Sequence, residues 1–390
     1  MAMRTAAGVA ALNPMTKTPV HVLHVVYRFA AGGLENVIVQ LINELPEGGF
    51  RHTVLALTTI DEAFATRIKR QDVQLISLNK GPGQPFNLYP RVYRILRQLK
   101  PDVFHTCNLA ALEFAPVAFA AGVPLRVHAE HGWDISDPDG SNRSYQILRR
   151  LYRPFVHRFV VVSNQLRDYL LQQVRVPASK VSLIPNGVDL RTFRPIEHVD
   201  EASVPDGWPF DRAQHWVVGT VGRQEPIKNQ MLLARAVVRL LQERPGAFPR
   251  LRVVMVGAGP LHADIQRVFD DAGESGRLWM PGVRSDIASI LRHLDCFVLP
   301  SLAEGTSCTL QEAMATALPI IATRVGGNSS LLQDGRLGTL VPADDVSAMA
   351  EAIGEEYGVS MPNTAANEFV RQTYDLQNVL NRYCLLFTKG

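Results

Sequence analysis

Short apolar runs alternate with longer amphipathic segments along most of the chain. A short apolar run is typical of a strand buried in a parallel sheet, and apolar residues three and four apart are typical of a helix with one buried face. In the first half the pattern predicts strands at residues 21–26, 53–57, 73–78, 103–106, 126–130, 159–163 and 181–184. It predicts helices around residues 37–42, 63–70, 88–99, 109–121, 143–155 and 165–173. This alternation predicts a mostly parallel sheet covered on both faces.

The same alternation resumes after a polar, proline-containing segment. Further strands are predicted at residues 216–221, 253–256, 295–299, 320–323 and 338–342, and helices at 309–315, 345–357 and 367–388. At 390 residues the chain exceeds what one hydrophobic core usually holds. The sequence therefore predicts an α/β protein with two Rossmann-like, doubly wound domains at residues 21–193 and 215–366, a loose tail at 1–20, a linker at 194–214 and a C-terminal helical segment at 367–390.

Residues 300–315 connect the predicted strand 295–299 to the predicted helix 309–315. Gly305 allows a tight turn, and Thr306 or Ser307 can cap the helix. A helix that begins just past the carboxyl end of a parallel strand presents unpaired N–H groups and a positive dipole end. Such a site suits a phosphate or an oxygen-rich ligand.

Two carboxylates stand at the ends of this stretch. Glu304 and Glu312 lie eight positions apart, on the order of 10 Å along a helix. Each carboxylate can accept two hydrogen bonds, which suits a vicinal diol. One could bind a sugar ring and the other a ribose, at the two ends of a nucleotide sugar. The alternative is that both are ordinary solvated side chains, one in a loop and one on a helix surface.

The stretch E-G-T-S-x-T-x-x-E-A-M-A-x-x-x-P-I-I-A-T-x-V-G-G resembles the donor-site signature of the GT4 family of retaining glycosyltransferases. The resemblance implies the GT-B fold, with two Rossmann-like domains facing across a cleft and a last helix that crosses back to the first domain. It also implies that a nucleotide diphosphate sugar is the substrate. Ala317 is a departure, because the family usually has glycine there.

The resemblance assigns donor contacts on this stretch. Glu304 and the N–H groups near Gly305, Thr306 and Ser307 would hold the sugar, and Glu312 would hold the ribose. Leu310 is expected on the same donor side.

A cationic segment follows the strand at 216–221. Arg223 and Lys228 come just past the strand end, where Gly222 allows the turn, and two cations there suit a diphosphate. The segment resembles the family's G-R-x-x-x-x-K-N motif. The alternative is two surface cations. With these side chains supplying positive charge, we expect no metal and no other cofactor.

The resemblance places three further groups beside the donor. Val283 and Arg284 would border the nucleotide base, and the turn at Gly32 and Gly33 would lie beside the phosphates. As a pattern alone, Gly-Gly is more often an ordinary tight turn. His131, in a turn after the strand at 126–130, could donate a hydrogen bond to the transferred sugar or be a structural hydrogen-bonder.

One further motif is weaker. Asp137-Pro138-Asp139 matches the D-x-D metal motif of the other glycosyltransferase fold, but it lies in a turn-rich segment. The role of a cation is already assigned to Arg223 and Lys228. We therefore expect no metal site there.

Charge and composition add the cellular context. Residues 1–195 hold 23 basic and 14 acidic residues, a net of +9, and the remainder has a net of −6. A basic half suits an anionic membrane surface or an acidic partner, or it is uneven surface charge without a role. Residues 143–158 could form a basic amphipathic helix on a membrane, or a core-facing helix with a solvated cationic edge.

The remaining composition indicates a soluble, cytoplasmic protein, peripheral on the inner membrane face. No run of 18 apolar residues and no signal-peptide pattern is present, and the four cysteines have neither metal-like nor disulfide-like spacing. No nucleic-acid partner is expected.

The segment E-H-G-W-D-I-S-D-P-D-G-S-N-R-S-Y-Q-I-L-R-R-L-Y-R-P-F-V-H-R also resembles the sugar transferases of bacterial exopolysaccharide clusters associated with exosortase systems. Together these patterns predict a hexosyltransferase that acts on a lipid-linked or oligosaccharide acceptor. The alternatives are a non-hydrolysing nucleotide-sugar epimerase of the same fold and a catalytically silent nucleotide-sugar-binding protein.

Overall fold

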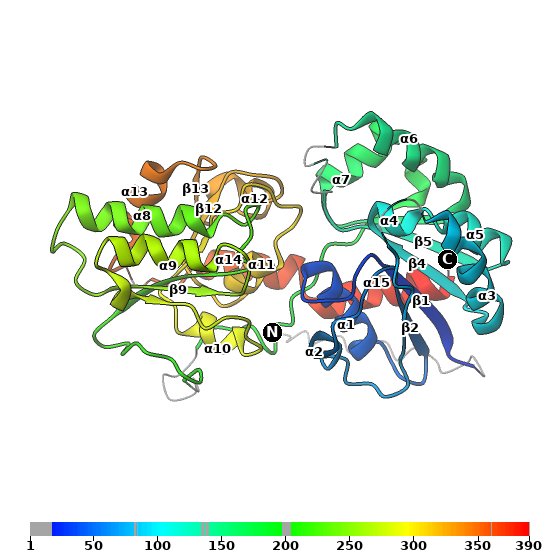
Figure 1. The fold of residues 1–390 in the computed structure, drawn as a ribbon, viewed down its shortest axis with the longest axis horizontal. Coiled ribbons are helices and arrows are strands. Elements are labelled where there is room, and N and C mark those ends of the chain that lie inside the picture. The colour runs from blue at the N-terminus through cyan, green and yellow to red at the C-terminus, as the bar shows by residue number, and fades with distance from the viewer. Residues whose placement is uncertain are drawn as a thin grey trace, which may run out of the picture. The chain divides into compact units, whose positions relative to one another are not determined.

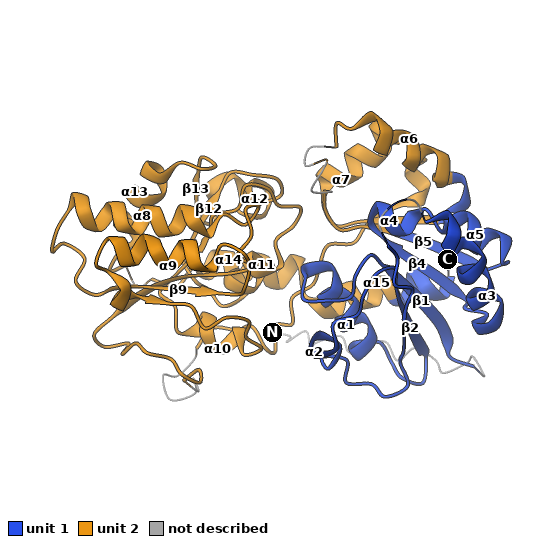
Figure 2. Cartoon of the chain, in the orientation of Figure 1, with its two compact units in different colours: residues 1–128, 154–157, 384–390 blue, residues 129–153, 158–383 orange. Residues whose placement is uncertain are grey.

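The computed structural model describes residues 18–81, 83, 85–133, 137, 140–196, 204–359 and 361–389. The chain divides into two compact units (Figure 2). Unit 1 comprises residues 1–128, 154–157 and 384–390, and unit 2 comprises residues 129–153 and 158–383. The domain limits that the sequence predicts stay predictions.

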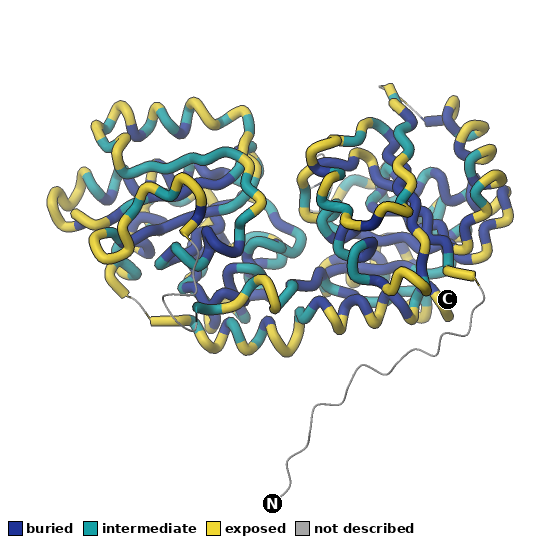
Figure 3. The backbone as a smooth tube through the Cα atoms, turned by 90° about the horizontal axis from the view of Figure 1, so that it is seen from below, coloured by how far each residue is buried: buried dark blue, intermediate teal, exposed yellow. Residues whose placement is uncertain are grey.

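The first sheet has seven strands in the order β3-β2-β1-β4-β5-β6-β7. Its strands are β1 (Val20–Val26), β2 (Phe50–Ala56), β3 (Gln74–Ser77), β4 (Val103–Cys107), β5 (Leu125–Glu130), β6 (Arg158–Val161) and β7 (Val181–Leu183). β1 pairs in parallel with both β2 and β4. Because β1 is central, six of its seven residues are buried, whereas no residue of the edge strands β3 and β7 is. Figure 3 colours the buried stretches of the chain dark blue. All seven strands were predicted to within a few residues.

The helices of this half follow the strands in sequence. They are α1 (Gly33–Glu44), α2 (Glu62–Ala65), α3 (Tyr89–Leu99), α4 (Asn108–Leu112), α5 (Ala115–Ala120), α6 (Arg143–Tyr152) and α7 (Asn164–Asp168). The single helix predicted at 109–121 is wrong, because Pro116 cannot continue the hydrogen-bond ladder and the chain forms α4 and α5 instead. The helix predicted at 63–70 ends early at Ala65. The Thr66 hydroxyl, at its C-cap, donates to the Ala63 carbonyl at 2.7 Å.

The second sheet has six strands in the order β10-β9-β8-β11-β12-β13. Its strands are β8 (Trp216–Val221), β9 (Leu251–Val256), β10 (Leu278–Trp279), β11 (Cys296–Leu299), β12 (Ile320–Thr323) and β13 (Thr339–Val341). Every neighbouring pair is parallel. Successive residues of each strand enter opposite cores: Val218 packs on one side and Val217 on the other.

Helices cover both faces of this sheet. They are α8 (Gln230–Glu243), α9 (His262–Asp271), α10 (Ile287–Arg292), α11 (Cys308–Ala315), α12 (Asn328–Leu331) and α13 (Val346–Glu356). Helices α8, α9 and α13 share one core and lie on one side of the sheet, and α10 and α11 contribute to the core on the other side (Figure 1). The predicted doubly wound arrangement is therefore confirmed for this sheet.

The C-terminal segment is two helices, α14 (Thr364–Thr373) and α15 (Leu376–Lys389), where the sequence predicted one. The break has a clear cause in hydrogen bonding. The Tyr374 carbonyl accepts from the Val188 N–H at 2.8 Å, and the Leu376 N–H donates to the Val188 carbonyl at 3.0 Å. These backbone groups are therefore engaged with another segment rather than with a helical ladder. Residues of α15 up to Tyr383 belong to unit 2 and those from Cys384 to unit 1.

Candidate active site

Apart from Gly32 and Gly33, the predicted donor residues lie in or just after loops at the carboxyl edge of the second sheet. In this sheet β8 lies between β9 and β11. The chain adds β9 and β10 on one side of β8 and β11 to β13 on the other, so the strand order reverses between β8 and β11. Ligands of open parallel sheets bind at such a switch point, beyond the carboxyl ends of the strands. The loop after β8 carries Lys228, and the loop after β11 carries Glu304.

Lys228 and Glu304 form an ion pair at this point. Lys228 Nζ donates to Glu304 Oε1 at 2.7 Å, and Ser301 Oγ donates to the same oxygen at 2.6 Å. The Glu304 side chain is 6% exposed and that of Lys228 is 27% exposed. The structure thus brings together the predicted diphosphate cation and the predicted sugar carboxylate. Ser301 was not among the predicted site residues, although it stands three positions before Glu304.

Arg223 takes a different direction from Lys228. Its Nη1 lies 2.9 Å from Glu225 Oε1, in a pair whose two side chains are 47% and 30% exposed. Lys228 shares the same short segment, because its N–H donates to the Glu225 carbonyl at 3.0 Å. The two predicted cations therefore stand on one turn, but only Lys228 contacts Glu304.

Helix α11 begins as the sequence predicted. Ser307 is the N-cap, and its Oγ accepts from the Leu310 N–H at 3.3 Å. The Leu310 side chain is fully buried in the core. The backbone of Leu310 is thus bonded to the cap, and its side chain is part of the core. Gly305, Thr306 and Ser307, the residues predicted to contact the donor, form the turn that precedes the helix.

Two glycines that were given no role support this turn. A Cβ at Gly326 would overlap the Glu304 carbonyl, and one at Gly327 would overlap the Gly305 carbonyl. Gly326 also has a φ of +49°, which side-chain-bearing residues rarely adopt. The Gly-Gly pair that ends the donor signature was the available signal, and its function is close backbone packing.

A similar contact links the loops after β8, β9 and β10. A Cβ at Gly257 would overlap the Gly222 carbonyl, and the Gly257 N–H donates to the Gly282 carbonyl at 2.8 Å. Gly282 directly precedes the predicted base-binding residues. Val283 is 65% exposed, and Arg284 bonds Asp286 at 2.6 Å with its guanidinium 5.9 Å from the Trp279 ring centroid.

His131 and Gly132 follow β5 and lie against the donor turn. A Cβ placed on Gly305 would be 3.0 Å from Gly132 Cα and 3.1 Å from the His131 carbonyl oxygen. All three residues belong to unit 2. The predicted sugar-binding turn and the predicted histidine turn are therefore neighbours.

Cys308 is a further group that sequence reasoning did not assign. Asn186 Nδ2 lies 3.4 Å from its Sγ. Burial, followed by the charges of Glu312 and Glu304, raises the pKa of the Cys308 thiol to about 12. The thiol is therefore neutral near pH 7, and it is no nucleophile.

Gly32 and Gly33 belong to unit 1. Gly32 is the N-cap of α1 and Gly33 is its first residue, as the predicted strand, turn and helix require. A Cβ at Gly32 would overlap the Glu35 carboxylate, so an acidic group lies at this helix end.

The D-x-D segment is described only in part. Asp137 is buried and its Oδ1 accepts from the Asn142 N–H at 2.9 Å, which stabilises the turn before α6. Asp139 lies outside the described residues. Within the described chain, no group of three or more potential metal ligands is found.

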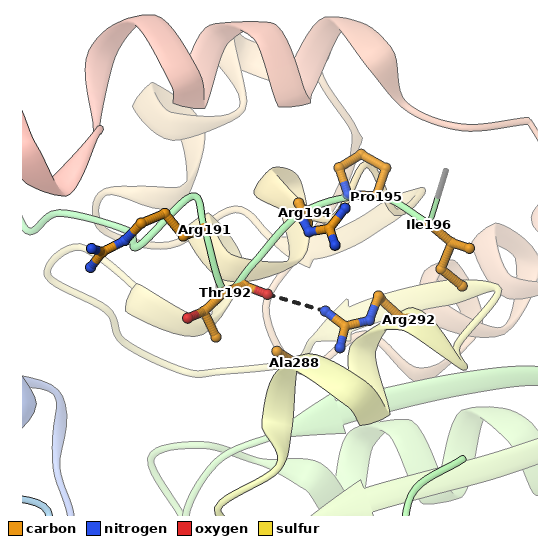
Figure 4. A pocket seen from close by; sticks show the side chains of 7 residues that line it. All are labelled: Arg191, Thr192, Arg194, Pro195, Ile196, Ala288 and Arg292. Carbon is orange, nitrogen blue, oxygen red and sulfur yellow. Dashed lines mark hydrogen bonds between the residues drawn. The ribbon is translucent and has the colours of Figure 1, made fainter. Parts of the chain in front are cut away.

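A hollow of about 240 Å³ contains none of the predicted site residues (Figure 4). In it, Arg292 Nη1 donates to the Thr192 carbonyl at 3.1 Å. Burial and the charge of Arg194 lower the pKa of Arg292. The hollow is lined by Arg191, Thr192, Arg194, Pro195, Ile196, Ala288 and Arg292.

Two family models match this chain. Residues 31–192 match "Glycosyltransferase Family 4", and residues 215–357 match "Glycosyl transferases group 1". A galactosyltransferase of Escherichia coli, which is named for UDP-Gal and alpha-D-GlcNAc-diphosphoundecaprenol, is 27% identical over 348 residues, covering 87% of this chain and 88% of its own. The D-inositol 3-phosphate glycosyltransferase of Kineococcus radiotolerans is 33% identical over 212 residues, covering 50% of this chain and 48% of its own.

Solved structures share the fold. The crystal structure of Anabaena HepE in complex with UDP-glucose aligns with a TM-score of 0.76 at 19% identity, covering 95% of this chain and 100% of that chain. The glycosyltransferase of Rickettsia africae aligns with a TM-score of 0.74 at 18% identity, covering 95% and 98%. At these identities the likeness concerns the fold, and it confirms the predicted architecture.

Proposed function

We propose that this chain, a glycosyltransferase of the GT-B fold whose two halves match the family models above, is a GT4 enzyme that transfers a hexose from a UDP-sugar to a hydroxyl of a lipid-linked glycan, with retention. The observation that carries the proposal is the Lys228–Glu304 pair at the switch point of the second sheet, beside the start of α11. The names of the Escherichia coli and Anabaena proteins support a uridine nucleotide. The former also supports a diphospholipid-linked acceptor.

In this mechanism each side chain has one task. Lys228 and Arg223 neutralise charge on the leaving diphosphate, so the bond to the sugar breaks more easily. Glu304 accepts hydrogen bonds from sugar hydroxyls, and Glu312 binds the ribose. His131 donates to the transferred sugar. No covalent nucleophile on the protein is needed for these roles.

The proposal includes independence from metal ions, since side chains provide the positive charge. Transfer should therefore continue in EDTA. Loss of transfer in chelator and its recovery with manganese or magnesium would instead give a metal the role assigned to Arg223 and Lys228.

We place the reaction at the inner face of the cytoplasmic membrane, in synthesis of a cell-surface glycan or exopolysaccharide such as those of exosortase-associated clusters. Ile147 and Leu151, four apart on α6, are 59% and 60% exposed and support contact with a lipid surface. Among the described helices, none is long and apolar enough to cross a membrane. Binding to anionic vesicles should weaken as salt rises, and salt-independent binding would contradict the electrostatic part of this proposal.

Transfer is tested by incubating the protein with radiolabelled UDP-hexoses and a membrane extract. Label in the lipid phase supports the proposal. A changed sugar released in solution would indicate an epimerase, and neither outcome with tight UDP binding would indicate a binding protein. The Lys228→Ala variant, which removes the cation at the switch point, should transfer the sugar at least tenfold more slowly.

A further inference from the structure

A buried ion pair lies next to the His131–Gly132 turn. Arg149 of α6 donates through Nε to Glu130 Oε1 at 2.6 Å and through Nη2 to Glu130 Oε2 at 3.2 Å. The two side chains are 5% and 1% exposed. Glu130 is the last residue of β5 and directly precedes His131. The pair therefore fixes the point where the strand ends and the turn begins.

The sequence allowed two interpretations of the arginines around α6, as a membrane-binding face or as a solvated edge. Arg149 fits neither interpretation, because it is buried. Burial opposes its charge, but the Glu130 carboxylate outweighs burial and raises the pKa of Arg149. Removing two charges from water is costly, so a buried pair is weak evidence of stabilisation by itself. A pair in this position needs another explanation, and its neighbours provide one.

Two aromatic rings extend the pair to the other side of the turn. The Arg149 guanidinium carbon lies 5.5 Å from the Tyr169 ring centroid. Trp133, which directly follows Gly132, packs edge-on against Tyr169 with ring centroids 5.1 Å apart. The residues on both sides of the turn, Glu130 and Trp133, are thus anchored to one cluster that Arg149 joins.

The turn between these anchors lies against the donor turn. A Cβ placed on Gly305 would be 3.0 Å from Gly132 Cα, so the two backbones are closely packed and a side chain at Gly305 would displace one of them. We propose that Arg149 is a positioning residue, which acts through Glu130 and Tyr169 to hold the His131–Gly132 turn against Gly305. This inference rests on the proposed glycosyl transfer and on the role of His131 in it.

The test compares Arg149→Lys with Arg150→Lys. Lysine keeps the charge of Arg149 but cannot make two parallel bonds to a carboxylate. Arg150 is on the same helix and donates to the Gln173 carbonyl instead, so its variant is a matched control. We expect Arg149→Lys to lower kcat at least tenfold at a temperature well below its Tm. UDP affinity should stay within twofold, and Arg150→Lys should leave kcat unchanged.

A second pair of variants tests the proposal if changing one partner of the buried ion pair only destabilises the protein. Glu130→Gln leaves a buried cation unpaired, whereas Glu130→Gln combined with Arg149→Gln restores a neutral hydrogen-bonded pair. Partial recovery of kcat in the double variant supports positioning. Variants that lower only Tm, with kcat unchanged below it, would overturn the proposal, as would a His131→Ala variant with wild-type turnover. A wild-type protein that transfers no sugar would contradict the proposed function instead.

Discussion

Glu304 shows how much one side chain can define a site. Both of its hydrogen bonds end on Oε1, and within the described residues Oε2 accepts none. Lys228 and Ser301 thus orient the carboxylate, and in the proposed function its second oxygen would accept a hydrogen bond from a substrate hydroxyl. The side chain is 6% exposed, so few other orientations are open to it. A carboxylate with one oxygen fixed and one available suits sugar recognition better than a solvated loop residue does.

The two glutamates should have separable effects. Glu312→Gln should weaken both UDP and the intact donor, because it removes a ribose contact. Glu304→Gln should reduce transfer and leave UDP affinity unchanged, because it replaces an acceptor for the sugar with a donor. A hydrogen bond to a charged group is worth roughly 1.5–3 kcal/mol, about ten- to a hundredfold in affinity. Calorimetry with UDP checks this. Equal weakening of UDP by both variants would show that the turn at Glu304 contacts the nucleotide.

Ala317 has a backbone conformation that favours glycine. Its φ is +59°, directly after the C-terminal end of α11, where the related family usually has glycine. The left-handed conformation costs an L-residue about 1–2 kcal/mol, which offsets the lost methyl burial and the added chain entropy of glycine. Ala317→Gly should therefore be neutral or stabilising by up to about 1 kcal/mol, as measured by urea unfolding.

Ala315 provides the matched control for this substitution. It is the last residue of α11 and is fully buried. Glycine there loses helix propensity and methyl burial with no strain to relieve, so Ala315→Gly should destabilise by more than about 1 kcal/mol. A similar loss at both positions would mean that Ala317 is unstrained.

At the scale of elements, the site depends on loops that pack backbone against backbone. The turn before α11 contacts the loop after β12, and the loop after β8 contacts the loop after β9. Because the strands are parallel, all of these loops emerge at the same edge. Glycines at the contacts remove side chains that would separate them, and this places Lys228 and Glu304 within hydrogen-bonding distance.

Gly326→Ala tests this packing. The new Cβ would overlap the Glu304 carbonyl in a backbone conformation with positive φ, so the Glu304 turn must move. We expect transfer to fall at least tenfold together with a lower Tm. Gly276→Ala is the control, since nothing lies within 4 Å of its Cβ. Full activity of Gly326→Ala would argue that the turn tolerates displacement.

At the scale of the whole molecule, the two sheets differ in their interiors. The first contains a chain of buried histidines across β2, β1 and β4. His24 Nδ1 lies 2.9 Å from His105 Nδ1, and His24 Nε2 lies 3.0 Å from His52 Nδ1. Burial and then the charge of His52 hold the pKa of His24 well below its usual value, and burial and then Arg70 lower that of His52 to about 3. No strand of the second sheet contains a histidine.

Unit 1 should therefore lose stability in mild acid. In the folded protein these histidines have pKa values below the ordinary 6.5, so above that pH they are neutral in both states and the stability is fully present. Below it the unfolded chain binds protons that the folded chain does not bind, and the stability falls. Each such histidine should lower the free energy of unfolding by up to about 1.4 kcal/mol for each pH unit below pH 6.5. After correction for intrinsic exchange rates, hydrogen exchange should show β1 and β2 losing protection between pH 7 and 5. β8 and β9 serve as the internal control, and equal behaviour of both sheets would contradict the prediction.

Local patterns in the sequence determined most of the elements. Buried strands, glycine turns, the Ser307 cap and the start of α11 depend on neighbouring residues, so periodicity and capping rules predict them. Two helix predictions failed, one through a proline inside the predicted helix and one through hydrogen bonds to a distant segment. Pro116 divides a predicted helix, and Val188 takes the backbone bonds that a continuous helix between α14 and α15 would need.

The sequence also supplied the residue types of the site, through the spacing of Glu304 and Glu312 and the cations after β8. Only the tertiary structure decided which of them meet. Lys228 and Glu304 are 76 positions apart, and Glu130 and Arg149 come from a strand and a helix with a turn between them. Such contacts depend on strand order and close loop packing, which no local pattern encodes. Short sequence motifs therefore determine the residue types of the site, and the parallel sheet determines their positions, because it brings the loops that carry them to one edge.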